Sequence, residues 1–400
     1  MWSTHFTLQP PIRDETGIYE FVHAIGEKHR GAPSPKVEKN AYHAAAFLDS
    51  RLGDLLARLS RLKFSMTSAI LLVSCVFTLF LVAVTLLLNL PVVLAFLATL
   101  LFLLLQYLIG PAIVRGSTHL RYLDQGENPW LESIVSELCE KSDLEPPKLA
   151  IVLDRTPNAF IFGRTSKDAT LAVHEGLLRQ LNKDEVRAVV GHELGHLKHK
   201  DYFVVTMLSA LPLLAYWIAW GIFQTVRWGG SSSNNEKGGS VKAALFIVAV
   251  LAYAIYIITL LLVKGLSRLR EHYADAFSAY ITGQPRQLQS ALTKITYGLS
   301  LSPKPTTHAR TFYIGDPAMA KLEFRRIVEK REAYDLDRDG VLDERELQLA
   351  MEREAGSAIY SSNRWLSTHP PTYRRILLLR EIEEEMNTGR YSNERVYAHV

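Results

Sequence analysis

The chain has 400 residues, a formal net charge of +4 and 48% hydrophobic residues. So small a net charge disfavours a nucleic-acid-binding protein, and we expect no nucleic-acid partner. The two cysteines, Cys75 and Cys139, are too few for a disulfide framework. The N-terminus lacks a short apolar run with a cleavage site, so we expect no signal peptide.

Four stretches are long and apolar enough to cross a bilayer. They are Ser65–Leu88, Val92–Val114, Phe203–Val226 and Ala243–Val263, and none of them contains Asp or Glu. A soluble core helix of such length would usually show a polar face. The sequence therefore predicts a mainly α, multi-pass membrane protein in contact with membrane lipid.

Basic residues near the span ends predict the orientation. Ten Lys or Arg residues flank one side, whereas the opposite side has an uncharged turn and a loop, Arg227–Lys242, that carries three. Cytoplasmic loops carry the excess of Lys and Arg. We therefore expect a protein of the cell membrane with both termini, and the metal motif described next, in the cytoplasm.

The most informative stretch is Val189–Leu197, which reads VVGHELGHL. In a helix, residues four apart share a face, so His192 and His196 can direct both imidazoles at one metal ion. Glu193 lies beside them, where its carboxylate can reach a water molecule at the metal. Zinc suits such nitrogen ligands and leaves a position open for water when the protein supplies three.

A second acidic pair follows the fourth span, in the segment Ser267–Ala276. Glu271 and Asp275 are four residues apart and share a face of a predicted helix. We expect Glu271 to be the third zinc ligand and Asp275 to hydrogen-bond a ligand imidazole from the second shell. His272 is the competing third ligand, because imidazole is also a common zinc ligand.

Between the second and third spans, the pattern predicts a soluble region with a small mixed sheet. Short β-type runs occur at Lys148–Leu153, Ala159–Phe162 and Thr170–His174. A helix is expected to open at Asn128-Pro129-Trp130, and the zinc helix at Asn182, with Glu185 completing a capping box.

The two metal-ligand stretches together resemble the HtpX family of membrane-embedded zinc metalloproteases, relatives of the CAAX prenyl proteases. Gly191–Asp201 matches the family's zinc helix, including the trailing Asp201, and Ser267–Asp275 matches the segment that donates its glutamate ligand. The resemblance covers about Trp130–Arg380, apart from one insertion. It implies a cytoplasmic, gluzincin-type metalloprotease domain in which Asp201 belongs to the second shell.

Two shorter matches imply substrate-binding residues. Pro157–Phe160 resembles the family's Asn-Ala-Phe strand, so the resemblance implies that Asn158, Ala159 and Phe160 contact substrate. Ser367–Pro371 and the following Arg375 resemble its C-terminal motif. By that analogy His369 and Arg375 stabilise the oxyanion or bind the product carboxylate, although His369 before two prolines could equally form a structural turn.

The insertion, between Pro317 and Arg364, carries a second metal-binding pattern. Residues 335–346 fit the EF-hand loop at its diagnostic positions, between predicted helices at Ala320–Tyr334 and Glu344–Ala355. The expected calcium ligands are Asp335, Asp337, Asp339, the Val341 carbonyl, Asp343 and Glu346, with Gly340 at the sharp turn. Without a cation these carboxylates would repel one another. A magnesium site, a purely structural role and an acidic turn are the alternatives.

These patterns divide the chain into seven parts. They are an N-terminal region with a juxtamembrane helix (1–64), a transmembrane hairpin (65–114), a first catalytic part (115–202), a second hairpin (203–263), a second catalytic part (264–316), the EF-hand-like insertion (317–363) and a C-terminal catalytic part (364–400). The long N-terminal region and the polar pair His174-Glu175 depart from the family pattern.

The sequence thus predicts a zinc metalloendopeptidase that cleaves misfolded or membrane-associated proteins at the cytoplasmic face. The EF-hand-like loop adds the hypothesis that calcium modulates this activity. A CAAX-type prenyl-protein processing protease is the first alternative, since the same chemistry would serve it. A calcium-responsive membrane scaffold with a vestigial metal site is the second, and a competent residue at every proposed catalytic position argues against it.

Overall fold

The computed structural model describes residues 35–87, 91–228, 236–301, 313–339, 342–354, 367, 369–392 and 395–400. Within helices it describes the backbone alone at 35–59, 87, 203, 205–214, 226, 228, 236–244, 344 and 352. The chain divides into two compact units, Met1–Leu56 and Ala57–Val400. The elements named in the following paragraphs belong to the second unit, except for helix α2 (Pro35–Leu87), which extends into both.

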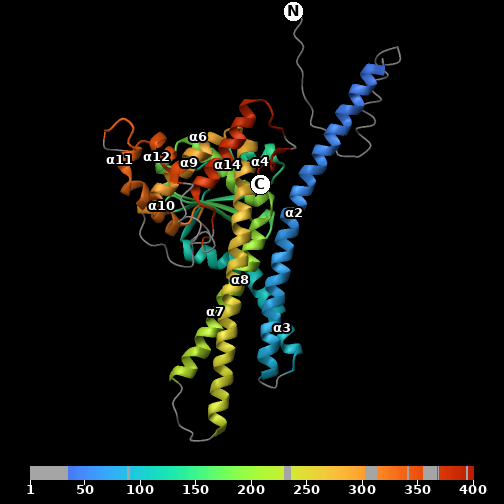
Figure 1. Cartoon of the computed structure of the whole chain (residues 1–400), viewed down its shortest axis with the longest axis vertical. Coiled ribbons are helices and arrows are strands. Elements are labelled where there is room, and N and C mark those ends of the chain that lie inside the picture. Colours follow the sequence, from blue (N-terminus) through green and yellow to red (C-terminus); the bar gives the residue numbers. More distant parts are fainter. Residues whose placement is uncertain are drawn as a thin grey trace, which may run out of the picture. The chain divides into compact units, whose positions relative to one another are not determined.

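Within the described residues, three helices are long and apolar enough to span a membrane: Ser60–Leu86, Val93–Thr118 and Leu245–Thr282. They belong to α2 (Pro35–Leu87), α3 (Val93–Thr118) and α8 (Glu236–Thr282). The stretch expected to be the third span forms α7 (Asp201–Trp228), which runs beside α8 (Figure 1). Many side chains of α7 lie outside the description, so its crossing of the bilayer stays a prediction.

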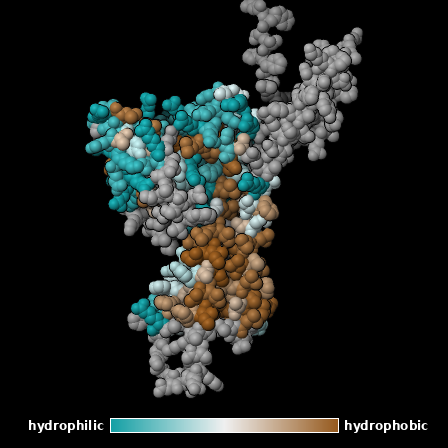
Figure 2. All heavy atoms as spheres, in the orientation of Figure 1, coloured by the Kyte–Doolittle hydropathy of each residue, from teal (hydrophilic) through white to brown (hydrophobic). Residues whose placement is uncertain are grey.

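The apolar helices pack together and expose hydrophobic side chains on their outer faces. Phe80 of α2, Ala219 of α7, and Val248 and Ala252 of α8 form one buried cluster. Figure 2 shows a brown hydrophobic patch over these helices on the face in view. Leu100 of α3 is 66% exposed. An apolar surface of this extent is typical of contact with lipid.

Helix α8 runs without interruption from the membrane span into the soluble region. The predicted boundary after residue 263, between the second hairpin and the second catalytic part, lies within this helix and stays a prediction. One continuous helix therefore carries both an apolar span and the acidic pair Glu271 and Asp275.

A four-stranded mixed sheet precedes the zinc-motif helix. It consists of β1 (Leu120–Tyr122), β2 (Lys148–Val152), β3 (Ala159–Phe162) and β4 (Thr170–His174), in the order β1-β2-β4-β3. Strands β2 and β4 are parallel, and the two outer pairs are antiparallel. The mixed sheet is confirmed, while β1 escaped prediction because three residues are too few for an alternating pattern. Strand β3 lies at an edge of this sheet.

Helices surround the sheet and the end of α8. They are α4 (Pro129–Ser142), α5 (Glu175–Gln180), α6 (Lys183–Lys198), α9 (Pro285–Leu301), α10 (Pro317–Glu329), α11 (Arg331–Tyr334), α12 (Glu344–Glu354) and α14 (Thr372–Asn387). The predicted capping box of α6, formed by Asn182 and Glu185, is confirmed, and the helix expected to open at Asn128 is α4, which Asn128 caps. The helix expected over Ala320–Tyr334 is instead broken at Lys330 into α10 and α11.

Close contact between α6 and α8 brings the metal motifs together. A Cβ atom on Gly195 would lie 3.0 Å from the Cα of Ala274, and one on Gly191 would lie 3.1 Å from Ser278 Oγ. The Ser278 hydroxyl donates to the Ala188 carbonyl at 2.6 Å. Small residues on the facing sides therefore let the two helices approach, so that α6 meets the α8 turn that carries Glu271.

Candidate active site

His192, His196 and Glu271 form a buried cluster whose ligand atoms lie within 4.8 Å of one another. The two Nε2 atoms are 3.2 Å apart, and each lies 3.5 Å from a carboxylate oxygen of Glu271. Tetrahedral zinc with bonds of about 2.0–2.1 Å separates its ligand atoms by roughly 3.3–3.4 Å. The three side chains therefore have the spacing of a zinc site. Within the described part of the chain, Glu271 and not His272 completes this group.

Each histidine is oriented through its other ring nitrogen. His192 Nδ1 lies 2.9 Å from Asp275 Oδ1, and His196 Nδ1 lies 2.6 Å from Asp201 Oδ2. Both carboxylates are buried. A carboxylate at Nδ1 accepts the ring proton there and leaves the Nε2 lone pair for a metal. The two second-shell residues expected from the sequence thus lie beside the two histidines.

The donor set fits a metal ion better than a network of hydrogen bonds. Oε2 of Glu271 is buried without a hydrogen bond from a described residue, although Arg375 Nη1 and His192 Nε2 each lie 3.5 Å from it. Buried polar atoms are normally satisfied, so an orphaned carboxylate oxygen indicates a ligand. Two imidazoles and one carboxylate form a set that zinc accepts in catalytic sites. His192, His196 and Glu271 would hold it.

Glu193 lies on the wall of the same pocket and forms no hydrogen bond or ion pair with the described residues. Its side chain is 3% exposed, and burial raises the pKa of the carboxyl group. A carboxylate that is not engaged elsewhere and has a raised pKa is suited to accept a proton and to donate it again near neutral pH.

Arg375 lies behind the metal-ligand cluster rather than in the pocket. It is 2% exposed and donates to both oxygens of Asp275, at 2.8 and 2.7 Å, and to the Ile314 carbonyl at 2.5 Å. The resemblance implies that Arg375 contacts the oxyanion or the product carboxylate, and that role stays a prediction. Its guanidinium is bound to Asp275 and does not line the pocket, which favours a positioning role through Asp275.

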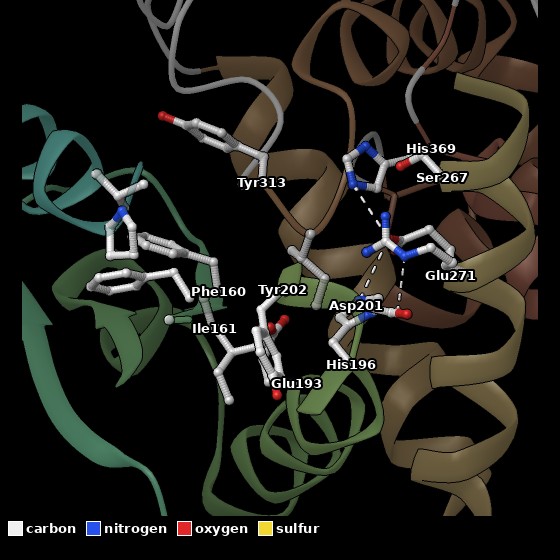
Figure 3. A pocket seen from close by; sticks show the side chains of 17 residues that line it. Phe160, Ile161, Glu193, His196, Asp201, Tyr202, Ser267, Glu271, Tyr313 and His369 are labelled. Atoms are coloured by element: carbon white, nitrogen blue, oxygen red, sulfur yellow. Dashed lines mark hydrogen bonds and ion pairs between the residues drawn. The ribbon is translucent and has the colours of Figure 1, made fainter. Parts of the chain in front are cut away.

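The pocket has one apolar and one polar wall (Figure 3). The apolar wall comprises Pro111 and Val114 of α3 with Phe160, Ile161 and Phe162 of β3. Glu193, His196, Asp201, Arg270, Glu271, Ser267 and His369 provide the polar wall. Tyr202, Tyr313 and Ile314 also contribute. The cleft therefore lies where a membrane-spanning helix meets the edge of the sheet and the metal cluster.

Three predicted substrate-binding positions lie differently with respect to this pocket. Ala159 and Phe160 line it. Asn158 is 1% exposed and does not line it, and its Oδ1 accepts a hydrogen bond from Ile314 N at 2.9 Å. The side chain of Asn158 thus holds the segment that carries Ile314. A direct contact of Asn158 with substrate stays a prediction.

His369 contributes to the pocket wall, with Nε2 3.7 Å from Glu271 Oε1. The polar residue His174, which departed from the family pattern, ends β4 behind the wall and packs edge-on against Phe160 and Tyr313. Burial lowers the pKa of His174 to about 4. This histidine is therefore neutral at physiological pH and acts as a packing residue.

Sequence patterns did not single out several pocket residues. Arg270, Ser267, Tyr202, Tyr313, Ile314, Pro111 and Val114 all belong to this group. A signal existed for Ser267, because it lies four residues before Glu271 and so shares its face of α8, and Arg270 shares a face with Ser267 three residues on. The others come from distant segments, so only the tertiary structure could bring them to the cleft.

In the insertion, Asp335, Asp337 and Glu346 each bring one carboxylate oxygen within 4.8 Å of the others. Asp343 caps α12: its Oδ1 accepts from Glu346 N at 2.8 Å, and Glu346 Oε2 accepts from Asp343 N at 3.1 Å. Asp339 is not in the cluster of three. The expected positions Gly340 and Val341 lie outside the described residues.

The chain is similar to a known protein family and to several of its members. The family model of peptidase family M48 matches residues 125–383. A protease HtpX homolog of Methanothermobacter thermautotrophicus is 40% identical over 197 residues, which are 49% of this chain and 70% of that protein. One of Thermococcus kodakarensis is 35% identical over 296 residues, 73% of this chain and 86% of the relative. The crystal structure of S. mikatae Ste24p aligns with a TM-score of 0.40 and 15% identity, covering 92% of this chain and 76% of that one.

Membrane-spanning helices, a cleft beside them and a buried histidine-glutamate cluster define the class of membrane metallopeptidases. The match to the family model spans more than half of the chain. The chain therefore belongs to peptidase family M48, and the HtpX-like character predicted from its two motifs is confirmed by the relatives.

Proposed function

We propose that this membrane metallopeptidase is a zinc-dependent endopeptidase that cleaves misfolded or membrane-associated proteins at the cytoplasmic face of the cell membrane. One observation carries the proposal: the unengaged carboxylate of Glu193 lines the same pocket as the His196 and Glu271 side chains of the zinc-spaced cluster. A base beside three metal ligands is the arrangement needed for metal-assisted hydrolysis.

Each protein group has a defined task in this proposal. Bound zinc would supply Lewis acidity for the attacking water and the scissile carbonyl. Glu193 takes a proton from the water and later delivers it to the leaving amine. His369, which also lines the polar wall, donates to the developing oxyanion. Arg375 and Asp275 keep His192 in the tautomer that binds metal.

We propose that substrate binds as an additional strand along β3. Strand β3 lies at an edge of the described sheet, and its residues Ala159–Phe162 line the pocket. Main-chain hydrogen bonds to an edge strand bind extended peptides with little sequence preference. Pro111 and Val114 extend the apolar wall from the membrane helix α3, which favours substrates at the membrane surface. Both features support the turnover of unfolded membrane-associated proteins.

The proposed topology has four spans, α7 included, with both termini and the active site cytoplasmic. Its support is the excess of basic residues at one set of span ends and the packing of Ala219 of α7 into the same apolar cluster as α2 and α8. In this topology the seven predicted parts of the chain keep the boundaries inferred from the sequence.

We further propose that calcium binds the loop 335–346 and modulates activity. The carboxylates of Asp335, Asp337 and Glu346 converge, as an EF-hand loop requires. The helices that flank the loop share a hydrophobic core with α14, to which Tyr373 and Ile376 contribute. Helix α14 also carries Arg375. Calcium binding that orders the loop can therefore shift α14, and with it the contact of Arg375 with Asp275 that orients His192.

The decisive experiment is proteolysis of an unfolded model protein by detergent-purified wild type and Glu193→Gln, with zinc supplied and calcium titrated. We expect wild type to cleave, and Glu193→Gln to bind one equivalent of zinc without cleaving. A farnesylated CAAX peptide tests the prenyl-processing alternative in the same assay. Cleavage by both proteins, or zinc binding by neither, contradicts the proposed function.

A further inference from the structure

Arg270 is a buried arginine of the cleft whose hydrogen-bonding capacity is largely unused. It lies on α8 directly before Glu271, lines the pocket and is 6% exposed. Its Nε lies 3.1 Å from Asp201 Oδ2 without hydrogen-bond geometry, and no hydrogen bond joins its guanidinium to a described residue. Five N–H donors on a guanidinium are normally satisfied when it is buried.

The two other arginines near the metal cluster, Arg375 and Arg268, do not have this combination of unused donors and a place in the pocket wall. Arg375 is as deeply buried, but its guanidinium is bound to Asp275 and Ile314 and does not line the pocket. Arg268 donates to the Ser367 carbonyl at 2.8 Å and does not line it either. Of these three, only Arg270 presents its charge to the cleft.

Charge balance leaves room for an anion at Arg270. The carboxylate of Asp201 is shared between Arg270 and His196, because its Oδ2 also accepts a hydrogen bond from His196 Nδ1 at 2.6 Å. The other carboxylates of the cleft, Glu193 and Glu271, are assigned to proton transfer and to the metal. Ser267 precedes Arg270 by three residues on the same helix face and lines the same pocket, so its hydroxyl can add a donor.

We propose that Arg270, assisted by Ser267, forms a carboxylate-binding subsite of the substrate cleft. The planar guanidinium matches a carboxylate in two-point geometry, which the point charge of a lysine does not reproduce. The carboxylate belongs to the peptide substrate, as an acidic side chain or as its C-terminus. This inference rests on the proposed function, since it names what the same cleft selects.

Binding to the inactive variant Glu193→Gln, loaded with zinc in detergent, tests the subsite without turnover. Fluorescence anisotropy measures the dissociation constants of two sets of matched peptides. In the first set, Glu replaces Gln at positions on either side of one fixed peptide bond, and all peptides have an amidated C-terminus. In the second set, a peptide with a free C-terminus is compared with the same peptide amidated. We expect at least one carboxylate peptide to bind about 10- to 100-fold more tightly than its neutral partner, as for hydrogen bonds to charged groups. The first set reports a side chain, and the second reports the C-terminus.

Three variants in the same background isolate Arg270. Arg270→Gln is expected to abolish the preference and Arg270→Lys to retain part of it. Arg268→Gln, which removes an equal charge one half-turn away, is expected to leave the ratio of the two dissociation constants unchanged. Equal binding of all matched pairs, binding of no peptide, or a preference that survives Arg270→Gln overturns the subsite. The proposed function fails separately, when wild type leaves unfolded protein uncut.

Discussion

Arg375 of α14 and Asp275 of α8 are joined by two hydrogen bonds, from Nε to Oδ2 at 2.8 Å and from Nη2 to Oδ1 at 2.7 Å. Asp275 Oδ1 also lies 2.9 Å from His192 Nδ1. A helix from the C-terminal region thereby orients a metal ligand on α6. The paired carboxylate couples two segments that are 100 residues apart in the chain.

Replacement of Arg375 by lysine should weaken zinc binding. Lysine keeps the charge but cannot donate to both oxygens of Asp275, so the orientation of His192 is lost. Loss of an outer partner of a metal ligand typically reduces affinity by about 10- to 100-fold. Competition with a zinc chelator measures the effect. The control is Arg374→Lys, an exposed neighbour on the same helix. Equal zinc affinity of the two variants would contradict the positioning role.

Gly195→Ala should separate α6 from α8. The added Cβ would lie 3.0 Å from the Cα of Ala274, which belongs to rigid helix backbone. Overpacking of this kind destabilises by about 1–3 kcal/mol, and we expect weaker zinc binding with it. Gly116→Ala, in a helix with nothing within 4 Å of the added atom, is the matched control. It should be neutral or slightly stabilising in thermal unfolding, because alanine favours helix.

Calcium should bind the insertion through Asp335 and Glu346. Isothermal titration of the zinc-loaded protein should show one calcium site, and Asp335→Ala or Glu346→Gln should remove it. Each variant deletes a carboxylate of the converging group, and calcium affinity depends on ligand charge. Asp343→Asn, which can still cap α12, should retain more affinity. The modulation proposal is refuted when Asp335→Ala and wild type have equal activity across the whole calcium titration.

Stability should fall as the pH rises toward neutral because of Glu323. Burial raises its pKa to about 7 from the ordinary value of 4.5. Between these values the native protein holds a proton that the unfolded chain releases, so stability is complete at the acidic end and is lost as pH rises. The loss amounts to roughly 3 kcal/mol at most.

Thermal unfolding of wild type and Glu323→Gln from pH 5 to pH 8 measures this contribution. The variant, which cannot ionise, should show a flatter profile and a higher midpoint at pH 8. Exposed Glu329→Gln is the control and should follow wild type. Parallel profiles for all three proteins would mean that Glu323 does not carry the pH dependence.

The C-terminal segment should stabilise the end of the zinc-motif helix. The Tyr397 hydroxyl lies 2.7 Å from His199 Nε2, and its ring packs on Tyr273, with centroids 5.0 Å apart. Tyr397→Phe loses one hydrogen bond, about 1 kcal/mol. Tyr397→Ala also loses the ring packing, about 3–5 kcal/mol. Denaturant unfolding should rank the two variants in that order, and equal small losses would show that the segment is not docked.

The sequence by itself predicted the apolar spans of α2, α3 and α8, the mixed sheet, the capped α6 and the group His192, His196 and Glu271. Local physics suffices for these features: an apolar run is read from its length, and two histidines four residues apart share a helix face in any fold. Glu271 was found because it also lies on a helix, although His272 was left open as its competitor. Family resemblance contributed Asp201 and the substrate strand.

Only the tertiary structure decided the remainder. The contacts of Arg375 with Asp275 and of Asn158 with Ile314 could not be read from the sequence, because a side chain's direction depends on what packs around it. Pro111 and Val114 reach the cleft from a membrane helix, and Tyr313 from a distant segment. Arg270 became notable only when the described structure showed a buried guanidinium in the cleft without hydrogen-bond partners. Periodicity reports which face of one element is buried, whereas the meeting of distant segments depends on packing of the whole chain.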